Sequence, residues 1–335
     1  MSELTWRDAT VERAMVLRER LLDELLEVLA ENGWDKFELL STERALRDAP
    51  EDLRGATSAV HLVAPGKVSD VSAAILDDVR ESPLVALGGG RVIDAAKAIA
   101  SVRGSEVAAV PTTLSGAPMT AIHMLPAGQE GLSGTRPSLV LADPEAMTSA
   151  PEEQLRATSM NAVAHGGDSL FTPLADTVSR SAGLSGIAMV ARQLDAAPGE
   201  RDRSELAMGA LLCGYAVDRA GLALQHVVSQ TAVRVWGTPH AETHAAMLPH
   251  TMAELAGRAP GRGAELAEAL GTEPGGISER IVELTGRRLR LQALGADRSL
   301  LDEVIETAMG RPELSAMTPG ELDREQLLAL LEAAW

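Results

Sequence analysis

The feature that most constrains the fold is a change of pattern near residue 150. Before that point, five short apolar runs alternate with stretches of helical periodicity, at residues 36–42, 59–65, 83–90, 106–113 and 137–144. Nearly continuous apolar strands that alternate with helices are typical of a parallel sheet covered on both faces. From residue 151 onward no strand pattern recurs, and Ala/Leu-rich helical patterns continue to Trp335.

We therefore predict two domains, an α/β domain at residues 1–150 and an all-helical domain at residues 151–335. The length of 335 residues agrees with this division, because it exceeds what a single hydrophobic core usually supports. Ahead of the first apolar run, leucines at helical spacing predict one long amphipathic helix over residues 9–32. Aromatic residues make up only 2% of the chain, so the core must be aliphatic and rich in alanine.

The net charge of −18, from 30 basic and 48 acidic residues, repels nucleic acid and anionic membranes. We expect neither as a partner. No apolar run reaches about 18 residues, and the polar N-terminus is not a signal peptide, so we expect a cytoplasmic protein. Cys213 is the only cysteine, which excludes an internal disulfide. Its apolar surroundings favour a buried, inert thiol over a nucleophile.

The stretch VALGGGRVIDAAKAIA places three glycines between a predicted strand and a predicted helix. At Gly88, Gly89 and Gly90 the backbone N–H groups and the helix dipole could hold a phosphate. The stretch is not G-x-G-x-x-G, and a tight turn without a ligand explains it equally well. The segment PTTLSG (111–116) strengthens the phosphate interpretation, because it ends the next strand, where ligands bind in open α/β sheets.

Three helical segments of the second domain carry most of the seven histidines. Asn161 and His165 lie at positions i and i+4, which share one helix face. Further along the chain come His226, His240 fourteen residues later, His244 and His250. Each histidine alone could be a hydrogen-bonded structural residue, and we expect this of His250. Several histidine motifs in one domain favour a functional site instead.

A zinc protease site is excluded by the stretch HAETH. It differs from the H-E-x-x-H motif in the position of its acid. Glu242 lies two residues after His240 and points away from the face that His240 and His244 share.

The motifs GGGRVIDAAKAIA, PTTLSGAPMT, NAVAH and H-x13-H, the last ending in PHAETHAAMLPH, occur in an order that resembles the iron-containing alcohol dehydrogenase superfamily. PHAETHAAMLPH and the closing LLALLEAAW look most like its maleylacetate reductase branch. The resemblance extends from about residue 36 to the C-terminus. It implies a dehydroquinate synthase-like fold, with a nucleotide-binding α/β domain and a helical catalytic domain. It also implies reduction of maleylacetate to 3-oxoadipate with NADH or NADPH, during the degradation of aromatic compounds.

Carried over by position, the resemblance assigns the cofactor pyrophosphate to Gly88–Gly90. It places Thr112, Thr113 and Ser115 along the cofactor site. Arg91 stands where the superfamily usually has a small serine. Its guanidinium could pair with a phosphate or could fill the pocket, and we favour the pairing.

The resemblance also identifies a catalytic set. In metal-dependent relatives an Asp and three His bind the metal, and the corresponding residues here are Asn161, His165, His226 and His240. A neutral amide is a poor replacement for a carboxylate on a divalent ion. Because the branch is understood to work without metal, we predict that none is bound. His226, His240 and, next, His165 are then the candidates for proton transfer.

For a small carboxylic acid substrate, the candidate binding residues are Asn161, His244 and Arg234. Arg234 could meet a carboxylate with two hydrogen bonds, although a surface salt bridge is an equally good explanation. A homodimer is usual for proteins of the family.

Four departures from the family pattern keep other hypotheses open. They are Arg91, Gln230 in place of a usual histidine, Pro118 in place of a usual acid, and the expected helix at 9–32 in place of an N-terminal strand pair. Gln230 cannot act as an acid or a base. The first hypothesis is an NAD(P)H-dependent reductase. The second is a divergent enzyme of the same fold with a non-redox reaction or altered cofactor use. The third is a non-catalytic homologue, which the retained histidines oppose.

Overall fold

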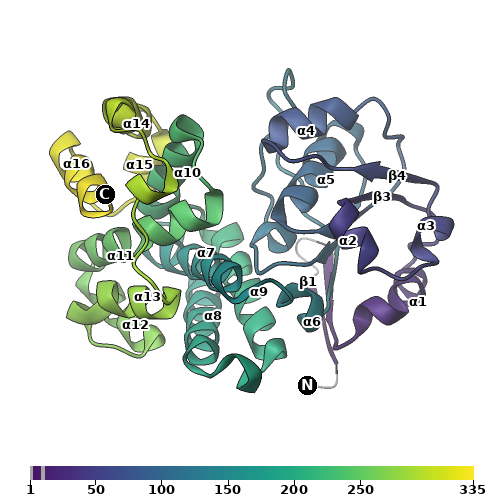
Figure 1. The fold of residues 1–335 in the computed structure, drawn as a ribbon, viewed down its shortest axis with the longest axis horizontal. Helices are drawn as coiled ribbons and strands as arrows, with labels where there is room; N and C mark the ends of the chain where they lie inside the picture. The colour runs from purple at the N-terminus through teal and green to yellow at the C-terminus, as the bar shows by residue number, and fades with distance from the viewer. Residues whose placement is uncertain (1–2, 9–11) are drawn as a thin grey trace. The chain divides into compact units, whose positions relative to one another are not determined.

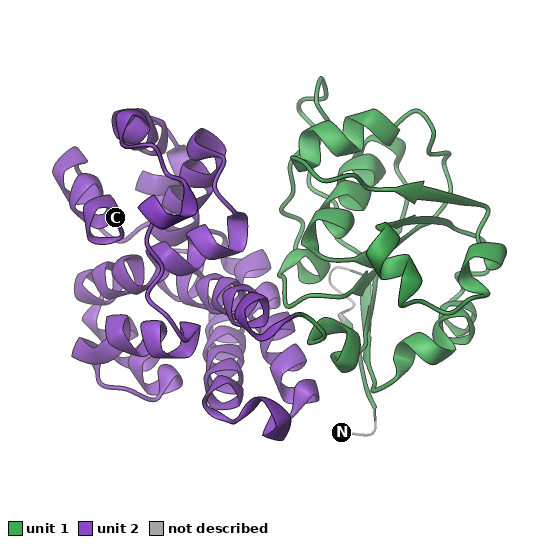
Figure 2. Ribbon diagram, in the orientation of Figure 1, with its two compact units in different colours: residues 1–150 green, residues 151–335 purple. Residues whose placement is uncertain are grey.

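The computed structural model describes residues 3–8 and 12–335. The chain divides into two compact units, residues 1–150 and residues 151–335 (Figure 2). The first contains a sheet with helices around it, and the second is built from helices (Figure 1). We call them the α/β unit and the helical unit and describe each by itself.

The described part of the α/β unit contains a seven-stranded sheet in the order β1-β2-β7-β6-β5-β3-β4. β1 runs antiparallel to β2, and the other neighbouring strands are parallel. The bounds are β1 Leu4–Asp8, β2 Arg13–Leu17, β3 Glu38–Ser41, β4 Ala59–Leu62, β5 Leu84–Gly88, β6 Val107–Pro111 and β7 Leu139–Ala142. Strands β3 to β7 fall within the five predicted apolar runs, which confirms the predicted fold class.

Helices cover both faces of the sheet because both sets of alternating strand residues are apolar. Val85 and Leu87 belong to a core cluster with η1, α1, α2 and α3. Leu84 and Ala86 belong to the opposite cluster, with α4 and α5. These helices are η1 Leu21–Glu24, α1 Leu25–Glu31, α2 Glu43–Arg47, α3 Leu53–Ala56, α4 Val68–Ile75 and α5 Gly90–Arg103. The short elements η2 Ala117–Met119 and α6 Pro144–Met147 complete the unit.

The prediction of one long helix over residues 9–32 is wrong. Residues 13–17 form β2, which pairs with β1 on one side and with β7 on the other. Arg20 then adopts a left-handed conformation, and only residues 25–31 form an α-helix. Residues 9–11 lie outside the described part of the chain. The apolar run of β2 suits a buried strand as well as a helix, and pairing with β7 decides between them. The strand pair that we expected to be missing is therefore present.

Residues 151–335, all of which the structure describes, form helices and loops without a strand. The helices are α7 Glu152–Phe171, α8 Thr177–Asp195, α9 Arg203–Ala220, α10 Leu224–Trp236, α11 His240–Arg258, α12 Pro260–Leu270, α13 Ile277–Thr285, α14 Leu301–Met309, α15 Pro312–Met317 and α16 Arg324–Ala333, joined by the short turns η3 Pro198–Glu200, η4 Pro274–Gly276, η5 Gln292–Leu294 and η6 Arg298–Leu300. α7 packs against α8, α9, α10 and α11. Glycines let these helices approach closely: a Cβ atom added at Gly186 would lie 2.6 Å from the carbonyl oxygen of Gly209.

Within the described residues, no single helix is long and apolar enough to cross a membrane. α9 and α10 pass the test of length and composition only when taken together, and they are bent by 98° at the break between them. Both helices are rich in buried residues.

A buried lysine holds the segment that follows β6. Lys97, on α5, is fully buried, and its ammonium group forms an ion pair of 2.7 Å with Asp94. The same group donates hydrogen bonds to the carbonyl oxygens of Ala117 and Ile122 and to the hydroxyl oxygen of Thr120, at 2.9–3.2 Å. One cation therefore satisfies acceptors along six residues of chain that have no regular sheet partner.

We predict that Lys97→Met lowers the free energy of unfolding by about 3 kcal/mol, because it leaves a half-buried carboxylate and two carbonyls without their donor. Urea denaturation followed by circular dichroism measures the effect. Lys36→Met is the matched control, since Lys36 is exposed. Equal stability of the two variants would show that the ammonium group contributes no net stabilisation.

Candidate functional site

The turn between β5 and α5 needs glycine at its first position. Gly88, the last residue of β5, has φ +158°, and a Cβ atom added there would lie 2.7 Å from a methyl group of Val92. Gly89 is the N-cap of α5 and has no side chain to cap the helix. The backbone of Thr112 donates a 3.0 Å hydrogen bond to the carbonyl oxygen of Gly88, which extends the β5–β6 pairing into the turn.

Hydroxyl groups from the next loop lie directly against this turn. A Cβ atom at Gly89 would lie 3.3 Å from the side chain of Thr113, and one at Gly90 would lie 3.2 Å from the Oγ atom of Ser115. The Oγ atom of Ser115 is buried and has no hydrogen-bond partner among the described residues. The structure therefore brings together the glycines, the two hydroxyls and the uncapped N-terminus of α5. This is a set of donors that fits a phosphate group.

Arg91 lies in the first turn of α5, and its side chain is exposed. It forms no hydrogen bond or ion pair with another described residue. Its guanidinium therefore has all five donors available to an anion. The exposure agrees better with pairing to a phosphate than with filling a pocket.

In the helical unit, four predicted histidines form a continuous row of rings. His165 on α7 stacks on His226 on α10, with ring centroids 4.6 Å apart and an interplanar angle of 19°. His226 meets His244 on α11 at 4.9 Å and 60°, and His244 meets His240 at 4.3 Å. His226 and His244 are buried, His165 is half-buried, and His240 is exposed.

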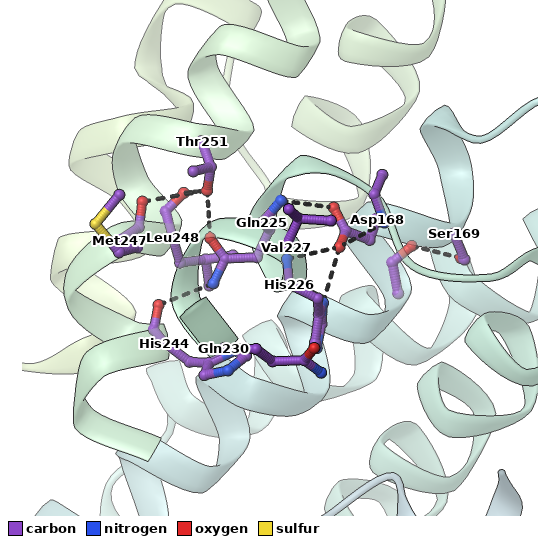
Figure 3. A network of polar contacts seen from close by, with 12 residues as sticks. Asp168, Ser169, Gln225, His226, Val227, Gln230, His244, Met247, Leu248 and Thr251 are labelled. Atoms are coloured by element: carbon purple, nitrogen blue, oxygen red, sulfur yellow. Dashed lines mark hydrogen bonds and ion pairs between the residues drawn. The ribbon is translucent and has the colours of Figure 1, made fainter. Parts of the chain in front are cut away.

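Asp168, which sequence reasoning missed, organises this row. Its carboxylate is fully buried on α7 and accepts hydrogen bonds from the backbone N–H groups of Ala223, Gln225 and His226, at 3.0–3.2 Å. It also pairs with the Nδ1 atom of His226 at 2.8 Å (Figure 3). The N-cap of α10, Ala223, has no capping side chain of its own. Asp168 thus caps α10 from a neighbouring helix and holds the ring of His226 with the same carboxylate.

The pairing with Asp168 decides which nitrogen of His226 is available. A carboxylate without a proton only accepts, so Nδ1 carries the hydrogen that lies between the two groups. Nε2 is then the nitrogen left for chemistry, and it is buried with no hydrogen-bond partner among the described residues. This is the arrangement in which a carboxylate orients a histidine for proton transfer.

The sequence held one signal for Asp168. It lies three residues after His165 and seven after Asn161, so helical spacing puts all three on one face of α7, and His165 and Asp168 both contact His226 on α10. An acidic residue in the apolar stretch NAVAHGGDSLF needs a buried partner. The partner is more than fifty residues away in sequence, and only the fold reveals it.

A second network fixes α11 beside α10. The side-chain amide of Gln225 donates a 3.1 Å hydrogen bond to the carbonyl oxygen of His244. Its oxygen accepts a hydrogen bond from the hydroxyl group of Thr251 (Figure 3). Gln225 is fully buried, so these bonds are shielded from water. They hold the backbone that carries His244.

The remaining predicted site residues take different positions. Asn161 is buried, and its Oδ1 atom has no hydrogen-bond partner among the described residues. Arg234 is exposed in the last turn of α10, away from its first turn, where Asp168 binds. Gln230, one turn after His226, accepts a 3.1 Å hydrogen bond from Arg311. Sequence reasoning did not consider Arg311, which lies 81 residues further along the chain.

Cys213 and His250, both considered in the sequence analysis, lie outside the row. Cys213 is fully buried on α9, and burial raises the pKa of its thiol to about 12, which confirms the predicted inert cysteine. His250 is half-buried on α11. Burial, followed by the charges of Arg288 and Arg290, lowers its pKa below the ordinary value.

The residues that correspond to an iron site do not fit a metal in this arrangement. The lone pairs of an imidazole lie in the ring plane, so the stacked rings of His165 and His226 direct theirs along nearly parallel planes. The fourth position, Asn161, offers a neutral oxygen. Among the described residues, no group of three or more His, Cys, Asp or Glu side chains is placed to hold a metal ion.

Comparison with known proteins shows the family to which the chain belongs. Residues 156–335 match the model for the C-terminal domain of the Fe-containing alcohol dehydrogenase family, and residues 16–151 match a model for iron-containing alcohol dehydrogenase. Maleylacetate reductase from Pseudomonas sp. strain P51 is 30% identical over 281 residues, which cover 81% of this chain and 79% of that protein. Maleylacetate reductase 1 from Rhodococcus opacus is 29% identical, with 90% of this chain and 88% of that one covered.

The fold agrees with solved structures. The crystal structure of maleylacetate reductase from Rhizobium sp. strain MTP-10005 matches with a TM-score of 0.85 and 25% identity, over 99% of this chain and 98% of that one. The enzyme from Agrobacterium tumefaciens matches with a TM-score of 0.84 and 26% identity, over 96% and 95%. The chain belongs to the iron-containing alcohol dehydrogenase superfamily, in its maleylacetate reductase branch. The family is NAD(P)-dependent, and this protein is an oxidoreductase, an NAD(P)H-dependent reductase.

We predict that Asp168→Asn lowers kcat roughly 100-fold or more, because an amide cannot accept from four donors and still hold the same tautomer of His226. The nucleotide affinity should stay unchanged. Steady-state kinetics and a nucleotide titration measure both quantities. Asp176→Asn is the control, since Asp176 caps α8 and an asparagine can also cap a helix. A kcat near that of the control would contradict the role of Asp168.

We predict that stability falls with acid because of His244. Burial, followed by the positive charges that His240, His226 and His165 carry when protonated, holds the pKa of His244 well below 6.5. The unfolded chain therefore binds a proton below about pH 6.5 that the folded chain does not, and stability is lost as the pH falls from there toward the folded pKa.

The titration of His244 alone can change the free energy of unfolding by at most about 1.4 kcal/mol per pH unit. His244→Leu should remove this pH dependence without losing a side-chain hydrogen bond, because neither ring nitrogen has a partner in the described chain. Denaturation curves at several pH values between about 7.5 and 5.5 compare the two proteins. Parallel losses of stability in the variant and the natural protein would refute the prediction.

Proposed function

We propose that the protein reduces maleylacetate, or a closely related unsaturated oxo acid, and that it does so without a metal. The observation that carries the proposal is the Asp168–His226 pair. It orients a histidine toward the other histidines of the row at the place where metal-dependent relatives would hold a metal. The replacement of the metal-binding carboxylate by Asn161 supports the same conclusion.

The reaction needs a hydride and a proton. NAD(P)H, when held at the glycine turn, would supply a hydride to the substrate carbon β to the ketone. The electron pair of the C=C bond moves toward the ketone oxygen, and a proton then adds to the α carbon. The C=C bond becomes a single bond and the nucleotide is oxidised, so atoms and electrons balance.

The histidine row supplies the proton and a polar environment. Nε2 of His226 can take a proton and return it, while Nδ1 stays hydrogen-bonded to Asp168 in both states. His240, at the exposed end of the row, is the second candidate for proton transfer, and His165 the third. Asn161 has an amide that can bind a polar group of the substrate, and His244, with both ring nitrogens buried and unpartnered, is the next candidate for binding.

We place the nicotinamide nucleotide at the glycine turn of the α/β unit. The turn, with Thr113 and Ser115 against it, offers backbone and hydroxyl donors, and Thr112 lies at its edge. Arg91 can add a charge-assisted hydrogen bond to a phosphate. Its exposed guanidinium also suits the extra phosphate of NADPH. The expected homodimer and cytoplasmic location stay predictions.

The proposal is tested by mixing the purified protein with maleylacetate and either NADH or NADPH. Oxidation of the nucleotide, with formation of 3-oxoadipate, is the expected result. A protein that binds nucleotide but oxidises neither form with this substrate would refute the proposed substrate. It would favour the divergent enzyme of the same fold.

We predict that protein purified without an affinity tag contains far less than one metal ion per chain and keeps its activity after chelation. Three neutral imidazoles without an anionic ligand should bind Fe²⁺ weakly. Elemental analysis, before and after treatment with a chelator, measures both properties. About one Zn or Fe per chain, with activity lost on removal and restored by the metal, would contradict this prediction.

We predict that Gly89→Val abolishes nucleotide binding and leaves the fold intact. Gly89 has φ −75°, which valine also adopts, so the effect comes from the side chain filling the space beside Thr113. Thermal shift with NADH and NADPH measures the binding. Gly55→Val is the control, because a Cβ atom there meets nothing within 4 Å. Unchanged affinity in a folded Gly89→Val protein would exclude the turn as the phosphate site.

A further inference from the structure

Gln230 stands where the family pattern usually has a histidine, and in this structure its side chain binds Arg311. Gln230 lies one turn after His226 on the same face of α10, and both side chains are drawn in Figure 3. The Oε1 atom of Gln230 accepts a 3.1 Å hydrogen bond from Nη1 of Arg311. Arg311 also reaches the carbonyl oxygen of Val227 at 3.4 Å. These contacts hold a guanidinium group against α10, within one turn of His226 in sequence.

The charge of Arg311 is only weakly neutralised. Gln230 and Val227 offer neutral oxygens, and the only acid on the guanidinium among the described residues is Glu313, at 3.3 Å from Nη2. The side chain of Glu313 is 47% exposed, whereas that of Arg311 is 15% exposed. A long contact to an exposed acid is a weak ion pair.

Arg311 also has donors left over. A guanidinium has five N–H groups, and three of them make the contacts above. The Nε–H and one Nη2–H group have no acceptor among the described residues. Two neighbouring N–H groups of a guanidinium can bind a carboxylate with two hydrogen bonds.

We propose that Arg311, positioned by Gln230, binds a carboxylate group of the substrate through its Nε–H and free Nη2–H groups, and that the neighbouring carboxylate of Glu313 competes with the substrate for the guanidinium. This inference rests on the proposed function, since it assigns one carboxylate of the oxo acid to a residue of the helical unit. It adds a substrate-binding arginine beside the histidine row and gives Gln230 a positioning role. Burial acts to raise the pKa of Glu313, but a hydrogen bond from its own backbone, then Arg311 and least of all Arg234, lower that pKa overall.

The test compares four variants by their KM for maleylacetate and by calorimetric binding of adipate, a six-carbon dicarboxylate that cannot be reduced. Arg311→Met should raise the KM and weaken adipate binding by about 10- to 100-fold, with kcat and the KM for nucleotide nearly unchanged. Arg311→Lys should weaken substrate and adipate binding less, because lysine keeps the positive charge but cannot donate two parallel hydrogen bonds to a carboxylate. Gln230→Leu should raise the KM and leave kcat unchanged.

Glu313→Gln should have the opposite effect, a severalfold lower KM and tighter adipate binding, because it removes the competing carboxylate. Glu332→Gln is its matched control: Glu332 is also 47% exposed and pairs with Arg298 instead. If Arg311→Met does not fold, Arg311→Lys and Glu313→Gln still decide the question.

An unchanged KM and unchanged adipate binding in the folded Arg311 variants would overturn the inference and leave the proposed function standing. A natural protein that binds adipate through Arg311 but does not reduce maleylacetate would support the carboxylate site and refute the proposed substrate. Equal behaviour of Glu313→Gln and Glu332→Gln would overturn the role of Glu313.

Discussion

The buried carboxylate of Asp168 is the interaction on which the helical unit depends. It closes the N-terminus of α10, fixes the distance between α7 and α10, and orients His226. A buried charge is costly unless several donors surround it, and here four donors do. Because the same oxygens serve the fold and the histidine, the stability of α10 and the direction of Nε2 cannot vary independently.

The sequence predicts the parts of the structure that depend on continuous local patterns. β3 to β7 are apolar runs between turns, and a buried parallel strand requires that pattern. The strand β2 is also apolar, but the leucines that follow it continue at helical spacing. What makes residues 13–17 a strand is their pairing with β7, which the local sequence does not reveal. The helix predicted over residues 9–32 therefore forms only from Leu25 onward.

In the candidate site, too, the sequence predicts residues that stand in local motifs and misses residues whose partners are distant in sequence. Gly88 and His226 became candidates because they stand in motifs of adjacent residues that resemble a family pattern. Asp168 and Arg311 did not, because their partners lie more than fifty residues away in sequence. Gln230 appeared in the sequence only as a loss of acid–base chemistry. In the structure its Oε1 atom accepts a hydrogen bond from Arg311.

The central claim is that Asp168 fixes the tautomer of His226, with Nε2 left for chemistry. The most direct test is ¹⁵N NMR of protein labelled in histidine, at about pH 8, where free imidazole is neutral. His226 is assigned by comparison with a His226→Gln protein. We predict a proton on Nδ1 and none on Nε2, and a change in this resonance pattern in Asp168→Asn. A proton on Nε2 with Nδ1 bare, or a pattern that Asp168→Asn does not alter, would contradict the account.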